Sequence, residues 1–86
     1  MIVRFHRNFD KQSKKLKISE KKKTQERFLL FIQNPYHPVL NNHPLKGKYL
    51  DYRSINITGD LRAIYKLISD NEVIFVAIDS HSNLYY

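Results

Sequence analysis

The chain has 86 residues, contains no cysteine and carries a formal net charge of +7 at pH 7. Its length predicts one domain, residues 1–86, with a modest core and no deep pocket. The lack of cysteine excludes disulfide bridges and thiolate metal sites. No apolar run is long enough to cross a bilayer and no signal peptide is evident, so we expect a cytoplasmic protein with no membrane partner.

The positive charge is unevenly distributed along the chain. Residues 1–34 contain ten lysines and arginines against three acidic residues, whereas residues 35–86 contain five of each kind. This asymmetry indicates that the N-terminal part binds a polyanion or an acidic protein, although a lysine-rich helix face can also simply be solvated. The lysines expected to contact such a partner are Lys14, Lys15, Lys21, Lys22 and Lys23.

The first part of the chain predicts a strand followed by two helices. Apolar and charged residues alternate over residues 2–6, which is the pattern of a strand. Asn8 is placed to cap a helix that begins at Phe9. Ser19, followed by an acidic residue, predicts the start of a second helix that runs to about Gln33. The apolar face of this second helix comprises Phe28, Leu29, Phe31 and Ile32.

The rest of the chain predicts three strands. Residues 34–43 form a polar loop that contains two of the three prolines. The segment 52–66 alternates polar and apolar residues on either side of turn residues 58–60, which predicts a hairpin. Residues 73–78, VIFVAI, have the character of a buried central strand, and residues 81–86 are expected to be a short tail.

The order strand–helix–helix–strand–strand–strand predicts an α+β fold. Hairpin-length links make the last three strands antiparallel, and the first strand must pair within the same sheet. We therefore expect two N-terminal helices packed on one face of a mostly antiparallel four-stranded sheet.

Several residues that can carry chemistry fall at the ends of predicted strands or in turns. His43, Asp60 and His81 can exchange protons, Arg62 lies on the hairpin, and Tyr85 follows four residues after His81. RNA can be cleaved by its own 2′-hydroxyl without a metal. One group must remove the hydroxyl proton, a second must protonate the leaving 5′-oxygen, and donors must stabilise the charged phosphorane. Histidine titrates near neutrality and aromatic rings stack on bases, so this set fits that chemistry.

Each of these residues also has a structural explanation. Asp60 is an ordinary turn residue, and an ion pair between Asp60 and Arg62 at the surface would contribute only about 0–1 kcal/mol. His43 could be a surface hydrogen-bonding residue, and His81 could simply follow the end of a strand. The four histidines do not have the spacing of a metal site, so we expect neither a metal nor another cofactor.

At these residues the chain resembles the YafQ family of bacterial toxins, within the RelE/ParE superfamily. The likeness spans nearly the whole chain, and its main segments are residues 42–47 (NHPLKG), 52–53 (YR), 60–66 and 81–85 (HSNLY). The resemblance implies a RelE-like fold and the toxin of a type II toxin–antitoxin system, a ribosome-dependent endonuclease that cuts mRNA in the ribosomal A site. It also implies a cognate antitoxin encoded alongside, with operator DNA bound only by the toxin–antitoxin complex.

The resemblance suggests roles for individual residues. It assigns proton transfer to His43, Asp60 and His81, and the positioning of the nucleotide to Tyr85. Arg62 fits an arginine that faces the scissile phosphate in the wider RelE group.

The chain departs from the family pattern at one position. Some YafQ proteins carry a further histidine where this chain has Asn56, and asparagine cannot exchange a proton near pH 7. We expect Asn56 to orient a hydroxyl or phosphate, with Lys46 and Lys48 also binding the substrate. The basic helices would then contact ribosomal RNA or the antitoxin.

Two other functions are compatible with the sequence. A non-catalytic, ParE-like toxin would inhibit DNA gyrase by binding, but it would have no need for the histidines. A basic RNA-binding module without toxicity would bind RNA in a salt-dependent way and cause no growth arrest.

Overall fold

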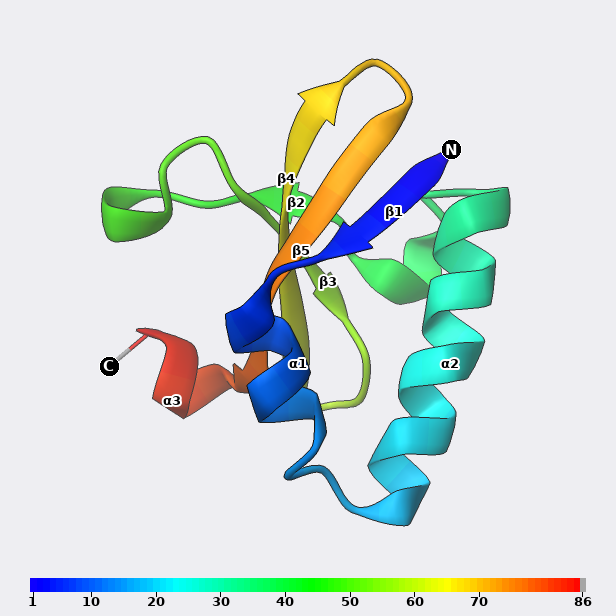
Figure 1. Ribbon diagram of the computed structural model, residues 1–86, viewed down its shortest axis with the longest axis vertical. Coiled ribbons are helices and arrows are strands. Elements are labelled where there is room, and N and C mark those ends of the chain that lie inside the picture. The colour runs from blue at the N-terminus through cyan, green and yellow to red at the C-terminus, as the bar shows by residue number, and fades with distance from the viewer. Residues whose placement is uncertain (86) are drawn as a thin grey trace.

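A computed structural model describes residues 1–85 of the chain (Figure 1). Within these residues, strands form one sheet in the spatial order β1-β5-β4-β3-β2. The strands are β1 (Ile2–Phe5), β2 (His43–Pro44), β3 (Arg53–Asn56), β4 (Leu61–Ser69) and β5 (Glu72–Ser80). The helices are α1 (Arg7–Ser13), α2 (Ile18–Gln33) and α3 (His81–Tyr85), with short 3-10 turns at Pro38–Leu40 and Gly47–Tyr49.

The sheet is mixed but mostly antiparallel. β1 pairs in parallel with β5, and the other neighbouring strands pair antiparallel. The predicted α+β fold is confirmed, but the sheet has five strands rather than four within the described residues. The additional strand is β2, in which His43 and Pro44 pair with Ser54 and Arg53. A two-residue strand is too short to show an alternating pattern, so periodicity could not predict it.

The C-terminal segment forms helix α3 through residue 85, where the sequence predicted only a tail; Tyr86 lies outside the described residues. The end of β5 stabilises the start of this helix. Asp79 Oδ1 accepts hydrogen bonds from the Ser80 N–H at 2.7 Å and from Asn83 Nδ2 at 3.1 Å, and Ser80 Oγ accepts one from the Asn83 N–H at 3.2 Å. Asp and Ser are preferred helix caps, which the prediction treated only as strand ends.

Both N-terminal helices begin earlier than predicted. His6, not Asn8, caps α1, because His6 Nδ1 accepts a hydrogen bond from the Asn8 N–H at 3.0 Å. At the start of α2, the Glu20 carboxylate accepts a hydrogen bond from the Lys17 N–H at 2.9 Å. Neither histidine nor lysine belongs to the preferred N-cap residues, which explains the misplaced starts. Helix α2 ends at Gln33, as predicted.

The main core lies between α2 and the sheet, on the right of the sheet in Figure 1. Phe31 of α2 meets Tyr65 of β4 and Phe75 of β5 edge to face, with ring centroids 5.0 and 5.4 Å apart. The ring of Phe28 lies 4.6 Å from that of Phe75. Such aromatic pairs contribute about 0.5–1.5 kcal/mol each beyond the burial of their area, so this cluster fixes α2 against the sheet.

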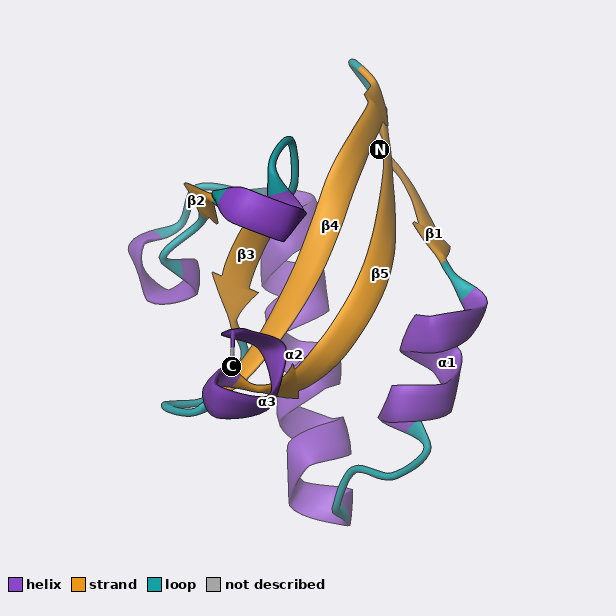
Figure 2. Ribbon diagram, turned by 90° about the vertical axis from the view of Figure 1, so that its left-hand side faces the viewer, coloured by secondary structure: helices purple, strands orange, loops and turns teal. Residues whose placement is uncertain are grey.

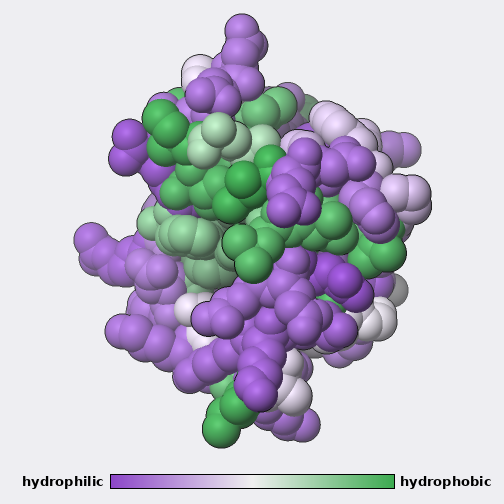
Figure 3. Space-filling model, turned by 90° about the vertical axis from the view of Figure 1, so that its right-hand side faces the viewer, coloured by the Kyte–Doolittle hydropathy of each residue, from purple (hydrophilic) through white to green (hydrophobic). Residues whose placement is uncertain are grey.

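Two of the four apolar residues predicted to face the core from α2 instead point outward. Leu29 is 64% exposed and Ile32 is 47% exposed. Each lies about 100° around the helix from Phe28 or Phe31, so the two pairs cannot face the same surface. Apolar side chains gather on this outer side of the molecule (Figure 3). No helix in residues 1–85 is both long enough and apolar enough to span a membrane.

The opposite face of the sheet is only partly covered. In Figure 2, α3 and the loop that follows β2 lie in front of the sheet while α2 lies behind it. Leu84 of α3 is buried against Ile64 and Ala77, and the rings of Tyr49 and Tyr52 are half-buried beside them. We call this side of the sheet the open face, and the candidate site lies on it.

Candidate functional site

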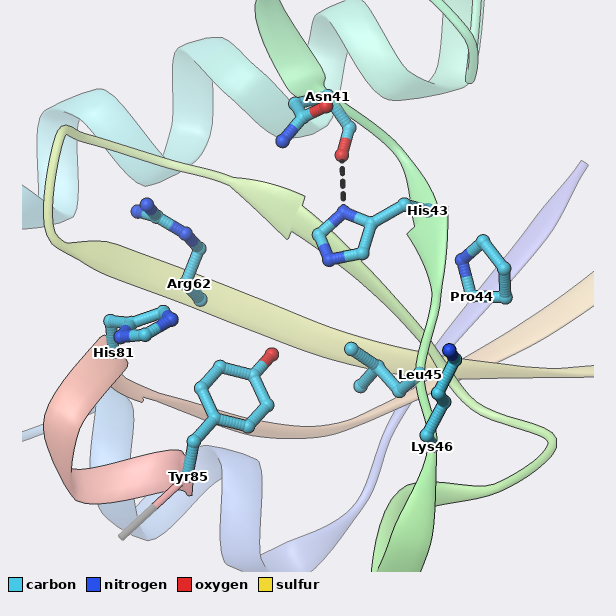
Figure 4. A pocket seen from close by; sticks show the side chains of 8 residues that line it. All are labelled: Asn41, His43, Pro44, Leu45, Lys46, Arg62, His81 and Tyr85. Atoms are coloured by element: carbon cyan, nitrogen blue, oxygen red, sulfur yellow. Dashed lines mark hydrogen bonds between the residues drawn. The ribbon is translucent and has the colours of Figure 1, made fainter.

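A hollow of about 530 Å³ lies on the open face between β2, β4 and α3 (Figure 4). It brings together five residues that the sequence analysis singled out, from segments far apart in the chain. Its lining consists of Asn41, His43, Pro44, Leu45, Lys46, Arg62, His81 and Tyr85. We call it the histidine hollow. It contains two imidazoles, a guanidinium and an ammonium, and none of its lining residues carries a carboxylate.

The hydrogen bonding of His43 fixes which ring nitrogen is free. Its Nδ1 lies 2.8 Å from the carbonyl oxygen of Asn41. A carbonyl oxygen only accepts hydrogen bonds, so Nδ1 must carry the proton and the neutral ring keeps its lone pair on Nε2. Asn41 has φ of 45°, a left-handed conformation that asparagine tolerates better than most residues. The Asn41 carbonyl, which the sequence analysis did not single out, thus leaves Nε2 as the nitrogen of His43 that is free to accept a hydrogen bond or a proton.

Asn42, between these two residues, anchors the loop to the body of the protein. Its Oδ1 accepts a hydrogen bond from Arg53 Nε at 2.8 Å, and its Nδ2 donates to the Tyr65 hydroxyl at 2.7 Å and the Pro35 carbonyl at 3.0 Å. Burial raises the pKa of the Tyr65 hydroxyl above its usual 10.0, an effect that the Asn42 bond and the Arg53 charge oppose. Through these bonds to Asn42, Arg53 braces the fold.

Replacing Asn42 with alanine should destabilise the protein by about 1–3 kcal/mol, because it leaves the buried Tyr65 hydroxyl and the Arg53 guanidinium without their partner. Urea denaturation followed by circular dichroism would measure this loss. The control is Asn71→Ala in the β4–β5 turn, where the side chain is exposed and makes no recorded hydrogen bond within residues 1–85. Equal stabilities of the two variants would contradict the bracing role of Asn42.

The guanidinium of Arg62 is positioned by the β3–β4 turn. Its Nη1 donates to the Thr58 carbonyl at 2.9 Å and the Leu61 carbonyl at 3.3 Å, and its Nη2 donates to the Gly59 carbonyl at 3.1 Å. The ion pair with Asp60 considered from the sequence is not formed; the only ion pairs within residues 1–85 lie elsewhere. The turn therefore orients the guanidinium without neutralising it, which suits an anionic ligand.

Asp60 contacts the site residue His81 through its backbone carbonyl rather than through its carboxylate. Its carbonyl oxygen accepts a hydrogen bond from the His81 N–H at 2.9 Å and so fixes the first residue of α3. Its side chain is exposed and lines a separate hollow with Glu20 and Asp79. The structure thus places the Asp60 carboxylate outside the histidine hollow.

Tyr85 provides the most direct sign that the hollow receives a polar group. Its hydroxyl is buried and has no hydrogen-bond partner among the described residues. In Figure 4 this hydroxyl points across the hollow toward His43. The ring lies 4.8 Å from that of His81 and tilts by 57° relative to it. Because buried polar atoms are nearly always paired, the hydroxyl marks a place for a ligand or water.

Two further predicted residues lie outside the histidine hollow. Asn56 points to the open face beside Arg62, its register partner, and its Oδ1 is buried without a hydrogen-bond partner in the described part of the chain. Lys48 lies over the ring of Tyr49 at 5.2 Å and lines a neighbouring hollow. Lys46 is the only predicted substrate-binding lysine that lines the histidine hollow within residues 1–85.

The predicted lysine cluster occupies one end of the molecule. Lys14 and Lys15 follow α1, and the other three lie in the first turns of α2, at the bottom of Figure 1. All are exposed except Lys23, which is half-buried and pairs with Glu26 at 3.3 Å. None of them lines the histidine hollow, so this cluster is a separate surface. Residues 1–85 contain no group of three or more His, Asp or Glu side chains that could hold a metal ion.

Comparison with known proteins gives similar structures over the whole chain. The crystal structure of YafQ from E. coli strain BL21(DE3) is 25% identical, has a TM-score of 0.77, and aligns over 98% of this chain and 97% of its own. YafQ in the E. coli DinJ–YafQ toxin–antitoxin complex is 25% identical, with a TM-score of 0.74 and coverages of 98% and 96%. A metal-bound toxin from Helicobacter pylori is 26% identical, with a TM-score of 0.70 and coverages of 99% and 99%.

The comparison with curated protein sequences found no significant match. The family model described as the bacterial toxin YafQ of type II toxin–antitoxin systems matches residues 1–86. That match spans the chain from β1 to the last residue and includes every residue of the histidine hollow. The chain therefore belongs to the YafQ family of bacterial toxins of type II toxin–antitoxin systems.

Proposed function

We propose that this toxin is an endoribonuclease that cleaves mRNA on the ribosome by metal-free acid–base catalysis. The observation that carries the proposal is the histidine hollow, where two imidazoles and a guanidinium face one another with no lining carboxylate. Cleavage by the RNA's own 2′-hydroxyl needs a proton acceptor, a proton donor and a cation near the phosphate. The hollow supplies one candidate for each role.

The hydrogen bonding of the site suggests how the roles are divided. His43 Nε2, with its lone pair kept free by the Asn41 carbonyl, removes the proton from the 2′-hydroxyl. The 2′-oxygen then forms a bond to phosphorus, and the bond from phosphorus to the 5′-oxygen breaks. His81 protonates the leaving 5′-oxygen, and Arg62 stabilises the charge on the phosphorane. The products are a 2′,3′-cyclic phosphate and a 5′-hydroxyl.

The remaining site residues support this reaction in our proposal. Tyr85 holds the nucleotide at the cleavage step, and Lys46 binds a neighbouring phosphate. Asn56 orients a polar group of the substrate from the floor of the open face. Asp60 remains a candidate for the acid–base set, but the geometry favours the two histidines because its carboxylate lines a different hollow.

The lysine cluster and the apolar surface support two macromolecular partners. The exposed lysines that follow α1 and begin α2 suit the phosphates of ribosomal RNA. Binding to the ribosome would place the toxin in the cytoplasm and supply the substrate orientation that a small protein lacks. An acidic, cognate antitoxin would be attracted to the same lysines. Exposed Leu29 and Ile32 give it an apolar surface to cover. DinJ bound to E. coli YafQ is the precedent, and operator DNA would be bound only by such a complex.

The test compares ribosome-bound mRNA with the same mRNA free in solution, and it identifies the chemical groups at the cut ends. We expect cleavage only on ribosomes, with 2′,3′-cyclic phosphate or 3′-phosphate ends and 5′-hydroxyl ends. Ends that carry a 5′-phosphate and a 3′-hydroxyl would contradict attack by the 2′-hydroxyl. Absence of cleavage by folded protein in every tube would instead favour a ParE-like toxin, to be tested by gyrase inhibition.

A further inference from the structure

A second hollow lies on the open face beside the histidine hollow. It has a volume of about 310 Å³, and its lining includes His6, Lys48, Tyr49 and Tyr52. The rings of Tyr49 and Tyr85 meet edge to face at 6.2 Å and form the wall between the two hollows. The surface of the catalytic site therefore continues across the sheet toward β1 and α1.

The aromatic rings on this surface form a continuous series. His81 contacts Tyr85 at 4.8 Å, Tyr85 contacts Tyr49 at 6.2 Å, and Tyr49 contacts Tyr52 at 6.1 Å. Each tyrosine is nearly perpendicular to the next, at 84° and 78°, so successive rings face different directions. All three tyrosines are half-buried, which fixes the rings while leaving part of each accessible. We call this series the tyrosine strip.

A lysine lies beside each of the two rings farthest from His81, those of Tyr49 and Tyr52. Lys48 Nζ lies 5.2 Å from the Tyr49 ring centroid, and Lys66 Nζ lies 5.5 Å from that of Tyr52. Neither lysine forms an ion pair within residues 1–85, and no carboxylate lines the second hollow. A lysine stem is flexible, so its ammonium can reach a phosphate while the adjacent ring stacks on a base. Rigid aromatic rings with mobile cations beside them are the features by which proteins bind single-stranded nucleic acids.

We propose that Tyr49, Tyr52, Lys48 and Lys66 form a subsite for a nucleotide of single-stranded RNA next to the scissile step. This inference rests on the proposed function, since it extends the path of the RNA beyond the histidine hollow. The rings read no base edges, so the subsite accepts any base and adds affinity rather than sequence preference. Double-stranded RNA does not fit this chemistry, because its bases are stacked within the helix and cannot lie on a protein ring.

The subsite can be tested by binding, without cleavage, using RNAs of two to six nucleotides that carry 2′-O-methyl groups and a fluorophore. With the full chain at low salt, each nucleotide that reaches the subsite should increase affinity about 5- to 150-fold, the equivalent of about 1–3 kcal/mol per stacked base. Extending the RNA separately at its 5′ and 3′ ends shows which end reaches the subsite. If extension at neither end increases affinity, the proposal is wrong.

Matched substitutions separate stacking from packing of the sheet face. Tyr49→Phe and Tyr52→Phe keep an aromatic ring and should keep the gain in affinity with RNA length. Tyr49→Leu and Tyr52→Leu keep an apolar side chain but should lose that gain. Tyr36→Leu, an exposed position outside both hollows, is the control and should bind as the unaltered protein does. A length-dependent gain that survives both leucine substitutions in folded protein would overturn the proposal.

The contribution of the lysines is measured by salt dependence. Replacing Lys48 and Lys66 with glutamine should reduce the slope of log affinity against log salt concentration by about 0.7 for each phosphate contact that is lost. An unchanged slope would remove the lysines from the subsite. His81→Ala should keep the length-dependent gain. If the unaltered protein binds long RNA better but never cleaves mRNA on ribosomes, the proposed nuclease function is wrong and the subsite stands. Cleavage without any length-dependent gain in affinity would support the nuclease function and overturn the subsite.

Discussion

Replacing His81 with alanine should reduce RNA cleavage by about 10²- to 10⁴-fold, the usual contribution of a positioned proton donor. His81 is exposed at the first position of α3, where its ring contacts that of Tyr85. Its backbone N–H, which bonds to the Asp60 carbonyl, is unaffected by the substitution. The change in the free energy of unfolding should therefore stay within about 0.5 kcal/mol, as for most surface substitutions.

The measurement is the rate of mRNA cleavage on ribosomes, supported by growth after induction of the toxin. Ser82→Ala is the matched control, because Ser82 is exposed in the same helix but does not line the histidine hollow. We expect cells that express His81→Ala to grow and cells that express Ser82→Ala to arrest. A folded His81→Ala protein that cleaves at the unaltered rate would remove His81 from the mechanism.

Replacing His43 should have an effect of similar size, about 10²- to 10⁴-fold on cleavage, because it removes the proposed proton acceptor. His43→Asn is the more informative substitution. Its side-chain amide can still donate to the Asn41 carbonyl, as Nδ1 does now, but it cannot take up a proton near pH 7. Loss of cleavage with an intact fold would assign the effect to chemistry rather than to loop structure.

Two comparisons complete the test of His43. His37→Asn changes a histidine outside the histidine hollow, where a ring nitrogen caps a 3-10 turn and asparagine can replace it, so cleavage should persist. The double variant His43→Ala/His81→Ala should be little less active than either single variant, because residues that act as a unit have non-additive effects. Strictly additive losses, or normal cleavage by His43→Asn, would contradict the proposed pairing of acid and base.

The sequence predicted the parts of the fold that rest on long periodic patterns. The apolar run at residues 73–78 lies in β5, and the segment 52–66 folds as the β3–β4 hairpin. The short elements depend on strand pairing and helix capping, which a periodic pattern does not reveal. β2 exists because two residues pair with β3, and α3 exists because Asp79 and Ser80 cap it.

The sequence analysis singled out residues that line the hollow, but it did not place every side chain. His43, Arg62, His81 and Tyr85, which the sequence analysis singled out, line one hollow. The position of the Asp60 carboxylate could not be predicted from the sequence, because it depends on the backbone conformation of the β3–β4 turn. In the turn, Thr58 Oγ1 accepts hydrogen bonds from the backbone N–H groups of residues 60 and 61. Three backbone carbonyls accept hydrogen bonds from the guanidinium of Arg62. These bonds leave the Asp60 carboxylate at the surface without the partner that its spacing suggested.

The pairing of β1 with β5 has a consequence for how the toxin is made. Ile2 pairs with Glu72, so β1 cannot pair until β5 has been synthesised, and such non-local contacts are slow to form. His81 and Tyr85 follow β5 directly, whereas His43 lies in β2, well before it. A polypeptide that has been synthesised only as far as β4 therefore contains His43 but no complete histidine hollow. The hollow can form only after β5 and α3 have been added, so its assembly is tied to the completion of the sheet.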